Sequence, residues 1–392
     1  MTEAVLERYL RLGLQLSRHV EGVVDAYFGP PELASRVEAE PPVEPRTLIT
    51  EADALLDELG DSWLRDQVVG LRTFAGVLAG ESYSFAAEAE GCYGVRPQYT
   101  DEAVFAAAHE RLEELLPGAG TLAERREHWK NSMLVPPDQI EATVVAVIEE
   151  ARTQTGRLVA LPAGEGVDVQ TVHDEPWLAY NFYLGDLRGR VAVNVDLPMS
   201  AIELLHLAIH ETYPGHQAER SLKEHLLATE QGMLEETLVL VPTPQSLITE
   251  GIAELAPRLL LDGDGGARFA AVIANAGVEF DFARALAIEQ AADPCRWAEV
   301  NAAMLLHEEG VNEPEVHEYL QRWGLMSPDL ATHLIRFIKD PTSRTYVMTY
   351  PAGHELCRSY VAGDPARFRR LLTEQVRVGD LLASRNAGAP MP

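Results

Sequence analysis

The chain contains little cysteine. Only Cys92, Cys295 and Cys357 occur in 392 residues, and they lie far apart without a C-x-x-C pair. A disulfide framework or a thiolate zinc site needs cysteines in pairs at characteristic spacing. The sequence therefore supports neither, and its cysteine content favours a reducing compartment.

Basic residues are also scarce. The chain has 32 Lys and Arg against 61 Asp and Glu, which gives a formal net charge of −29, and its lysines are Lys130, Lys223 and Lys339 alone. Proteins that bind nucleic acid or anionic membranes place basic side chains against phosphates. We therefore expect neither nucleic acid nor a membrane among the partners of this protein.

Long apolar runs are absent as well. No uninterrupted apolar stretch approaches the roughly 20 residues that a membrane-spanning helix needs. The chain begins with acidic side chains, where a secretory signal has a basic segment followed by an apolar one. These features predict a soluble, cytoplasmic protein.

What the chain does have is an ordinary globular composition with helical periodicity. It is 46% hydrophobic and 24% charged. Apolar residues recur at three- and four-residue spacing over residues 3–25, 48–80 and 101–116, which favours amphipathic helices. We expect residues 1–150 to form an N-terminal helical lobe.

The composition changes between residues 157 and 198. Runs of β-branched and aromatic residues begin at Arg157, Trp177 and Arg190, separated by Gly, Asp and Pro. Such runs predict a small sheet of about three strands. Helical periodicity returns from Ser200 to the end of the chain.

Histidine is concentrated in one short segment. Four of the 12 histidines lie between residues 206 and 225, and the run His210-Glu-Thr-Tyr-Pro-Gly-His216 ends an apolar helical stretch. In H-E-x-x-H zinc hydrolases, two histidines one turn apart bind the metal and the glutamate is the general base. Here the second histidine comes two positions later, so on a regular helix it would face another direction.

Two pairs of histidines are therefore candidates for metal ligands. Pro214-Gly215 would disrupt the regular helix, and a widened turn would bring His216 back to face His210. Alternatively, His206 and His210 are spaced i,i+4 and share one face of an unbroken helix. The spacing alone leaves both pairs open.

Two motifs together resemble a known bacterial family. The His210–His216 run and the later Thr249-Glu250-Gly-Ile-Ala-Glu254 resemble the family filed as domain of unknown function 885, with motifs H-E-x-x-P-G-H and E-G-W-A-x-x-x-E. This chain has Ile252 where the family has tryptophan. Members look like gluzincin-type metallopeptidases. The resemblance implies a mainly α, zincin/gluzincin-like fold of two helical lobes, with residues 1–392 as one domain and residues 151–392 holding the sheet and the metal-binding helices.

The resemblance also implies the site residues. His210, His216 and Glu250 would bind Zn²⁺, and Glu211 would act as general base. Glu254 lies one helical turn after Glu250 and would orient a ligand histidine from behind. On this assignment, His206 is a neighbour of the site rather than a ligand, and His225 faces solvent.

Hydrolysis at a carbonyl centre also needs a donor for the negative charge that develops on oxygen. By their position in the resemblance, Tyr350 and His354 are the candidates, and Arg358 would clamp a substrate carboxylate. Tyr213, inside the histidine motif, is an alternative donor by proximity.

Taken together, these residues predict a zinc-dependent hydrolase, a metallopeptidase that cleaves peptides or small amides. Two alternatives stay open: a zinc hydrolase of a non-peptide amide or ester, and a binding protein that keeps the scaffold without turnover. Cleavage mode and oligomeric state depend on the shape of the cleft and the surface, which the motifs do not specify.

Overall fold

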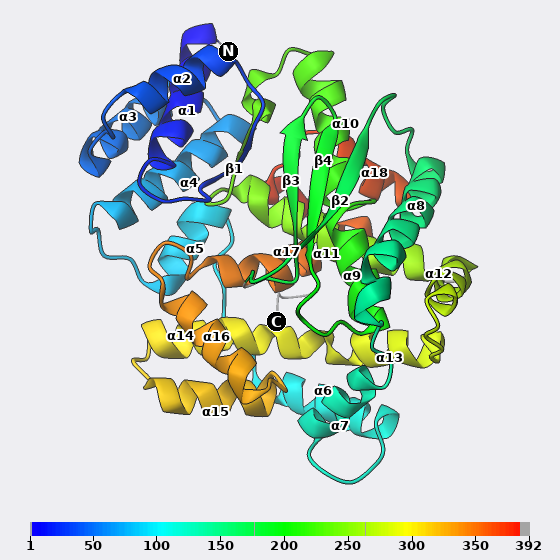
Figure 1. Cartoon of the computed structure of the whole chain (residues 1–392). Coiled ribbons are helices and arrows are strands. Elements are labelled where there is room, and N and C mark those ends of the chain that lie inside the picture. The colour runs from blue at the N-terminus through cyan, green and yellow to red at the C-terminus, as the bar shows by residue number, and fades with distance from the viewer. Residues whose placement is uncertain (1, 176, 263, 385–392) are drawn as a thin grey trace.

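The computed structural model describes residues 2–175, 177–262 and 264–384 and is mainly helical, as the sequence predicts (Figure 1). Within these residues, no helix has both the length and the apolar character needed to cross a membrane.

The first part of the chain forms short amphipathic helices. They are α1 (Glu3–Leu16), α2 (Pro31–Ala39), α3 (Pro45–Glu58), α4 (Trp63–Leu78), α5 (Phe85–Tyr93), α6 (Glu102–Leu115), α7 (Leu122–Asn131) and α8 (Ile140–Leu158), with a 3₁₀ turn at Pro137–Gln139. Side chains of Thr2, Ser62 and Thr121 accept hydrogen bonds from backbone N–H groups of the first turns that they cap. The helix expected over residues 3–25 stops at Leu16, and the one expected over 48–80 is divided between α3 and α4.

A three-stranded sheet follows, in the region where it is predicted. Its strands are β2 (Gly166–Val172), β3 (Ala179–Gly185) and β4 (Arg188–Asn194), in the order β2-β4-β3. β4 pairs in parallel with β2 and antiparallel with β3. Asp186 and Leu187 connect β3 to β4 with positive φ angles of 53° and 64°, as a two-residue hairpin of this hand requires. The run that begins at Arg157 is not a strand, because α8 continues to Leu158.

A second sheet joins distant parts of the chain. β1 (Val24–Tyr27) pairs antiparallel with β5 (Leu238–Leu240). The sequence analysis did not predict this pairing. It holds the N-terminal helices against the half of the molecule that carries the histidine motif.

The rest of the chain is helical. Its α-helices are α9 (Ala201–Glu211), α10 (His216–Lys223), α11 (Pro244–Leu261), α12 (Asp264–Asn275), α13 (Phe282–Ala292), α14 (Trp297–His307), α15 (Glu313–Trp323), α16 (Pro328–Lys339), α17 (Thr349–Val361), α18 (Pro365–Thr373) and α19 (Val378–Ser384). Shorter turns are the π-helical Glu224–Thr229 and the 3₁₀ segments Leu234–Thr237, Asp293–Arg296 and Tyr346–Met348.

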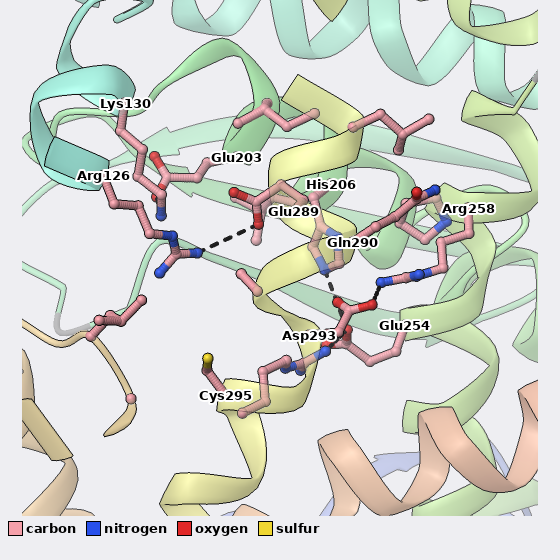
Figure 2. Close-up of a pocket in the computed structure, with 18 of the residues that line it drawn as sticks. Arg126, Lys130, Glu203, His206, Glu254, Arg258, Glu289, Gln290, Asp293 and Cys295 are labelled. Atoms are coloured by element: carbon pink, nitrogen blue, oxygen red, sulfur yellow. Dashed lines mark hydrogen bonds and ion pairs between the residues drawn. The ribbon is translucent and has the colours of Figure 1, made fainter. Parts of the chain in front are cut away.

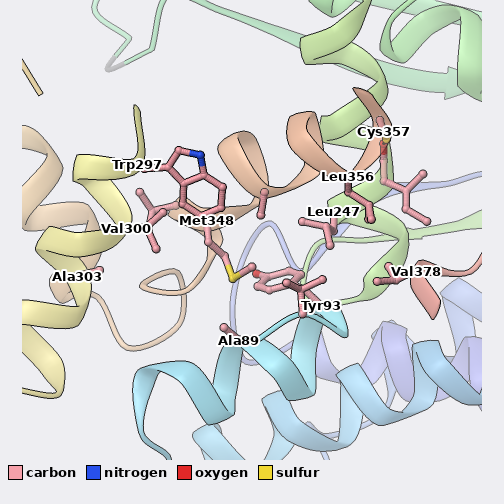
Figure 3. Packing of buried hydrophobic residues seen from close by; sticks show 14 of the residues in the cluster. Ala89, Tyr93, Leu247, Trp297, Val300, Ala303, Met348, Leu356, Cys357 and Val378 are labelled. Atoms are coloured by element: carbon pink, nitrogen blue, oxygen red, sulfur yellow. The ribbon is translucent and has the colours of Figure 1, made fainter. Parts of the chain in front are cut away.

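Helices α11 and α17 cross at the centre of the molecule (Figure 1). Gly251 faces Gly353 at the crossing, and a Cβ atom on either glycine would overlap backbone atoms of the opposite helix. The surrounding core includes Tyr93, Leu247, Trp297, Met348 and Leu356, drawn in Figure 3. Because glycine has no side chain, the two backbones approach closely there.

The hydrophobic cores cross the expected boundary at residue 150. Val5, Leu71 and their neighbours form one core with Leu238. Phe85 and Phe105 instead belong to the core around α11 and α17. The described parts of the first 150 residues therefore pack in more than one core.

Candidate metal and hydrolytic site

The histidine motif is divided between two helices. Ser200 and Glu203 form a capping box at the start of α9, which ends at Glu211. Residues 212–215 are not helical, the Tyr213–Pro214 peptide bond is cis, and α10 begins at His216. The expected widened turn of one continuous helix is therefore wrong, because the helix stops and restarts.

Gly215 allows the two helices to meet. A Cβ atom at this position would fall well inside van der Waals contact with the carbonyl oxygen of His210. Any residue other than glycine would push the start of α10 away from the end of α9. The Pro-Gly pair thus ends one helix and lets the next begin against it.

His210, His216 and Glu250 converge from three helices. The His210 Nε2 atom lies 3.5 Å from Glu250 Oε2, and His216 Nε2 lies 3.7 Å from Glu250 Oε1. The two imidazole rings are 4.7 Å apart and perpendicular. All three side chains are buried, and one ligand atom from each lies within 4.8 Å of the others. The break in the helix therefore brings together the three residues that the family resemblance implies.

The chemistry of this trio fits Zn²⁺. Two imidazoles and one carboxylate are zinc donors that leave a fourth position open. Burial raises the pKa of Glu250 to about 8 and lowers the pKa of His210 to about 4. Glu250 Oε2 has no hydrogen-bond partner among the described residues. A buried carboxylate with an unpartnered oxygen is costly unless a cation compensates it.

The alternative pair also has a carboxylate nearby. His206, His210 and Glu254 form a second group whose ligand atoms lie within 4.8 Å of one another, and His206 Nε2 is 3.5 Å from Glu254 Oε2 (Figure 2). However, Arg296 donates to the same Glu254 oxygen at 2.5 Å. A guanidinium at this position already neutralises the carboxylate and repels a metal cation, so the trio with Glu250 is the better fit.

Glu254 instead lies behind His210. Its Oε1 atom is 3.6 Å from His210 Nδ1, on the opposite side of the ring from Glu250. Although burial opposes the charged form, Arg296 and His206 hold the pKa of Glu254 well below its ordinary value. An ionised carboxylate in this position can orient a metal-binding imidazole, which agrees with the role predicted for Glu254.

The trio lies at the wall of a cavity of about 370 Å³, together with Glu211 and Tyr350. Burial, followed by the charge of Glu250, raises the pKa of Glu211 to about 8. Burial and the same carboxylate raise the pKa of Tyr350 well above its ordinary value, so its phenol stays protonated. A carboxyl group and a phenolic donor thus share one cavity with the metal-ligand trio.

The sequence analysis did not identify three residues that line the cavity, Tyr346, Arg220 and Asp25. Tyr346 donates a hydrogen bond to Glu250 Oε1 at 2.7 Å. Arg220 lies four residues after His216 on α10 and forms an ion pair with Asp25 of β1. The i,i+4 spacing from His216 could have indicated Arg220, whereas nothing in the local sequence indicates Asp25.

A buried polar contact fixes α10 against α11. Lys223 donates to Glu219 Oε1 at 2.7 Å, and Thr249 donates to the same oxygen at 3.1 Å. Thr249 directly precedes Glu250, so this contact helps to set the rotation of both helices relative to the candidate ligands.

Other predicted residues lie outside the cavity. Arg358 donates to Glu355 on its own helix and is not among the lining residues, so its assignment as a clamp in this cavity is wrong. Tyr213 is fully buried and its hydroxyl donates to Glu165 at 2.5 Å, which excludes it as the donor for the cavity. His354 is buried but does not line the cavity. His225 is partly exposed, as expected.

Comparison with known proteins finds structures of similar fold but does not assign the chain to a family. No family model matches the chain significantly, and no curated protein does either. One similar solved structure is a "putative lipoprotein" from Colwellia psychrerythraea, at 15% identity and a TM-score of 0.56 over 91% of this chain. Another, of unknown function, comes from Shewanella oneidensis, at 12% identity and a TM-score of 0.54 over 94% of this chain. The chain spans 65% and 68% of their lengths. At such low identity the likeness concerns the fold alone.

Proposed function

We propose that this protein is a zinc-dependent hydrolase of peptides or small amides, with the two-lobed zincin-type arrangement that the family resemblance implies. The observation that carries the proposal is the convergence of His210, His216 and Glu250 beside Glu211 in one cavity. These residues come from three separate helices, and packing alone gives no reason for four buried ionisable groups to meet.

In this proposal, His210, His216 and Glu250 hold the metal. Zinc, when bound, supplies a Lewis acid that polarises the scissile carbonyl and lowers the pKa of water. Glu211 accepts the proton of the attacking water and then delivers it to the leaving amine. The Tyr350 phenol donates a hydrogen bond to the carbonyl oxygen as negative charge develops on it.

Two groups keep the ligands in position. Tyr346 donates to Glu250, which limits the rotation of that carboxylate. Glu254 faces the Nδ1 atom of His210 and favours the tautomer that presents Nε2 to the cavity.

The first test is metal content, measured by mass spectrometry on wild type and His216→Ala purified with zinc present. We expect about one zinc per wild-type chain and none in the variant. The matched control is His225→Ala, because His225 is a partly exposed histidine of the same segment and its loss should leave the zinc in place.

A broad screen of peptides and small amides on the zinc-loaded protein then tests catalysis. If wild type binds no zinc, the hydrolase proposal fails. If it binds zinc and cleaves nothing, the scaffold alternative replaces it. If His216→Ala keeps its zinc, the metal site belongs to His206 and His210.

A further inference from the structure

A second pocket lies behind the metal-ligand cluster. It has a volume of about 500 Å³ and shares no lining residue with the cavity. Helices α7, α9, α11 and α13 and the Asp293–Arg296 turn form its walls, as Figure 2 shows. Its size is within the range of small-molecule sites.

The charge of this pocket differs from that of the chain. Four of its lining residues are basic: Arg126, Lys130, Arg258 and Arg296. Five are acidic: Glu203, Glu254, Glu289, Asp293 and Glu299. The whole chain has 61 acidic against 32 basic residues. A pocket with nearly balanced charge suits a ligand that carries both signs rather than an anion or a cation alone.

Most of these charges are already paired at short range. Lys130 donates to Glu203 and Arg296 to Glu254, each at 2.5 Å. Arg258 is in contact with Asp293. The charged groups in these pairs therefore have little remaining hydrogen-bonding capacity for a ligand.

Arg126 and Glu289 are the exception among these pairs, and the pKa of the fifth acid, Glu299, is raised to about 7 by burial. Their closest nitrogen and oxygen atoms are 3.6 Å apart, which is too far for a hydrogen bond. The Arg126 and Glu289 side chains are 20% and 34% exposed, although the unpartnered Nε atom of Arg126 and Oε1 atom of Glu289 are themselves buried within the described chain. This pair therefore offers one cationic and one anionic group, side by side, that are partly exposed and not hydrogen-bonded to each other.

Apolar side chains lie around the open pair. The lining includes Ile202, Leu207, Leu286, Leu325, Met326 and Leu330. Leu330 is 53% exposed, although a large aliphatic side chain loses free energy by remaining in water. The surface would accept an aliphatic group of a few carbons.

We propose that this pocket binds a free α-amino acid with an apolar side chain. Arg126 receives the carboxylate, Glu289 receives the ammonium group, and the side chain lies against the leucines. An α-amino acid fits because its two charged groups are attached to one carbon, so they reach a cation and an anion that are neighbours. The proposal does not depend on the hydrolase assignment, since it concerns binding to a separate pocket.

Isothermal titration calorimetry with L-leucine on the purified full chain tests this proposal. We expect binding in the range of about 10 μM to 1 mM. Leucinamide, which lacks the carboxylate, N-acetylleucine, which lacks the ammonium group, and glycine, which lacks the side chain, should each bind at least about tenfold more weakly.

Arg126→Gln and Glu289→Gln should each weaken leucine binding by about tenfold or more. The matched control is Arg111→Gln, because Arg111 is an exposed arginine outside both cavities. Tyr350→Phe reports on the other cavity and should bind leucine as wild type does. Circular dichroism at matched temperature checks that each variant is folded.

The proposal is overturned if leucine, isoleucine, methionine and phenylalanine all fail to bind. It is also overturned if folded Arg126→Gln binds leucine as wild type does, or if Tyr350→Phe abolishes binding. The last result would place the amino acid in the hydrolytic cavity. Zinc content is unaffected by any of these outcomes, so failure here leaves the hydrolase proposal intact.

Discussion

At the scale of single residues, the environment of Glu211 separates two possible roles. Its side chain is buried beside Glu250 and lines the cavity rather than pointing into a hydrophobic core. An amide keeps the shape of a carboxylate but cannot accept a proton. Substitution by glutamine therefore stops proton transfer by a general base, and the protein keeps its metal if the glutamate is not a ligand.

We therefore predict that Glu211→Gln keeps its zinc and loses hydrolysis by about 10²- to 10⁴-fold. The rate is measured on the best substrate of the peptide screen, with metal content determined on the same preparation. Glu230→Gln is the control, because Glu230 is an exposed acid that pairs with His225 and does not line the cavity. Zinc-loaded Glu211→Gln with the wild-type rate would remove Glu211 from the mechanism.

Arg296 is a residue-scale test of the arrangement behind His210. It donates to Glu254 at 2.5 Å, and Glu254 faces the Nδ1 atom of His210. We predict that Arg296→Gln weakens zinc binding by about 10- to 100-fold, the usual cost of losing a group that supports a ligand. Competition with a chelator of known affinity measures the change. An increase in affinity would instead indicate that the metal binds at Glu254, where Arg296 competes with it.

At the scale of elements, the sequence predicted what local patterns determine. The helical character of α6 and the strands β3 and β4 follow from periodicity and from the residues that separate the elements, whereas the sequence predicts a widened turn where α9 in fact stops and α10 begins. The β1–β5 pairing could not be predicted, because it joins a four-residue and a three-residue strand more than 200 positions apart. For the same reason the sequence could not indicate Asp25, which belongs to β1 and lines the cavity.

The glycines of the α11–α17 crossing also have an element-scale role. Gly251 follows the proposed ligand Glu250, and Gly353 lies three residues after Tyr350 on the facing helix. Their contact sets the distance between the proposed metal ligand and the proposed oxyanion donor. The glycine of the Glu-Gly motif is therefore explained by helix packing rather than by contact with a substrate.

We predict that Gly353→Ala destabilises the protein by about 1 to 3 kcal/mol and weakens zinc binding, because the added methyl group separates α17 from α11. Urea denaturation measures the stability. Gly379→Ala is the control, since a Cβ atom there meets nothing within 4 Å, and it should be neutral or slightly stabilising. Wild-type stability in Gly353→Ala would show that the crossing tolerates a wider spacing.

At the scale of the whole molecule, the buried site links stability to pH. In the metal-free protein, burial raises the pKa of Glu211 and Glu250 from 4.5 to about 8. Burial also lowers the pKa of His210 from 6.5 to about 4. The glutamates stabilise the fold at low pH and lose this contribution as pH rises through about 8, whereas the histidine loses its contribution as pH falls below 6.5.

Of these three groups, only the two glutamates change the stability between pH 6.5 and 8. We predict that the free energy of unfolding of the metal-free protein falls over this interval, by at most about 1.4 kcal/mol per pH unit for each carboxyl. Zinc should abolish the fall, because the cation stabilises the charged carboxylates. Urea denaturation at several pH values, with and without zinc, measures both. A flat profile without metal would contradict the burial of these groups.

The lysine content of the structure has a practical consequence for chemical labelling. The Lys130 ammonium group is held by Glu203, and the buried Lys223 is held by Glu219. Lys339 also forms an ion pair, with Glu313, but its side chain is about half exposed, at 48%. An amine-reactive dye or surface coupling should therefore attach at this one side chain far more readily than at the other two.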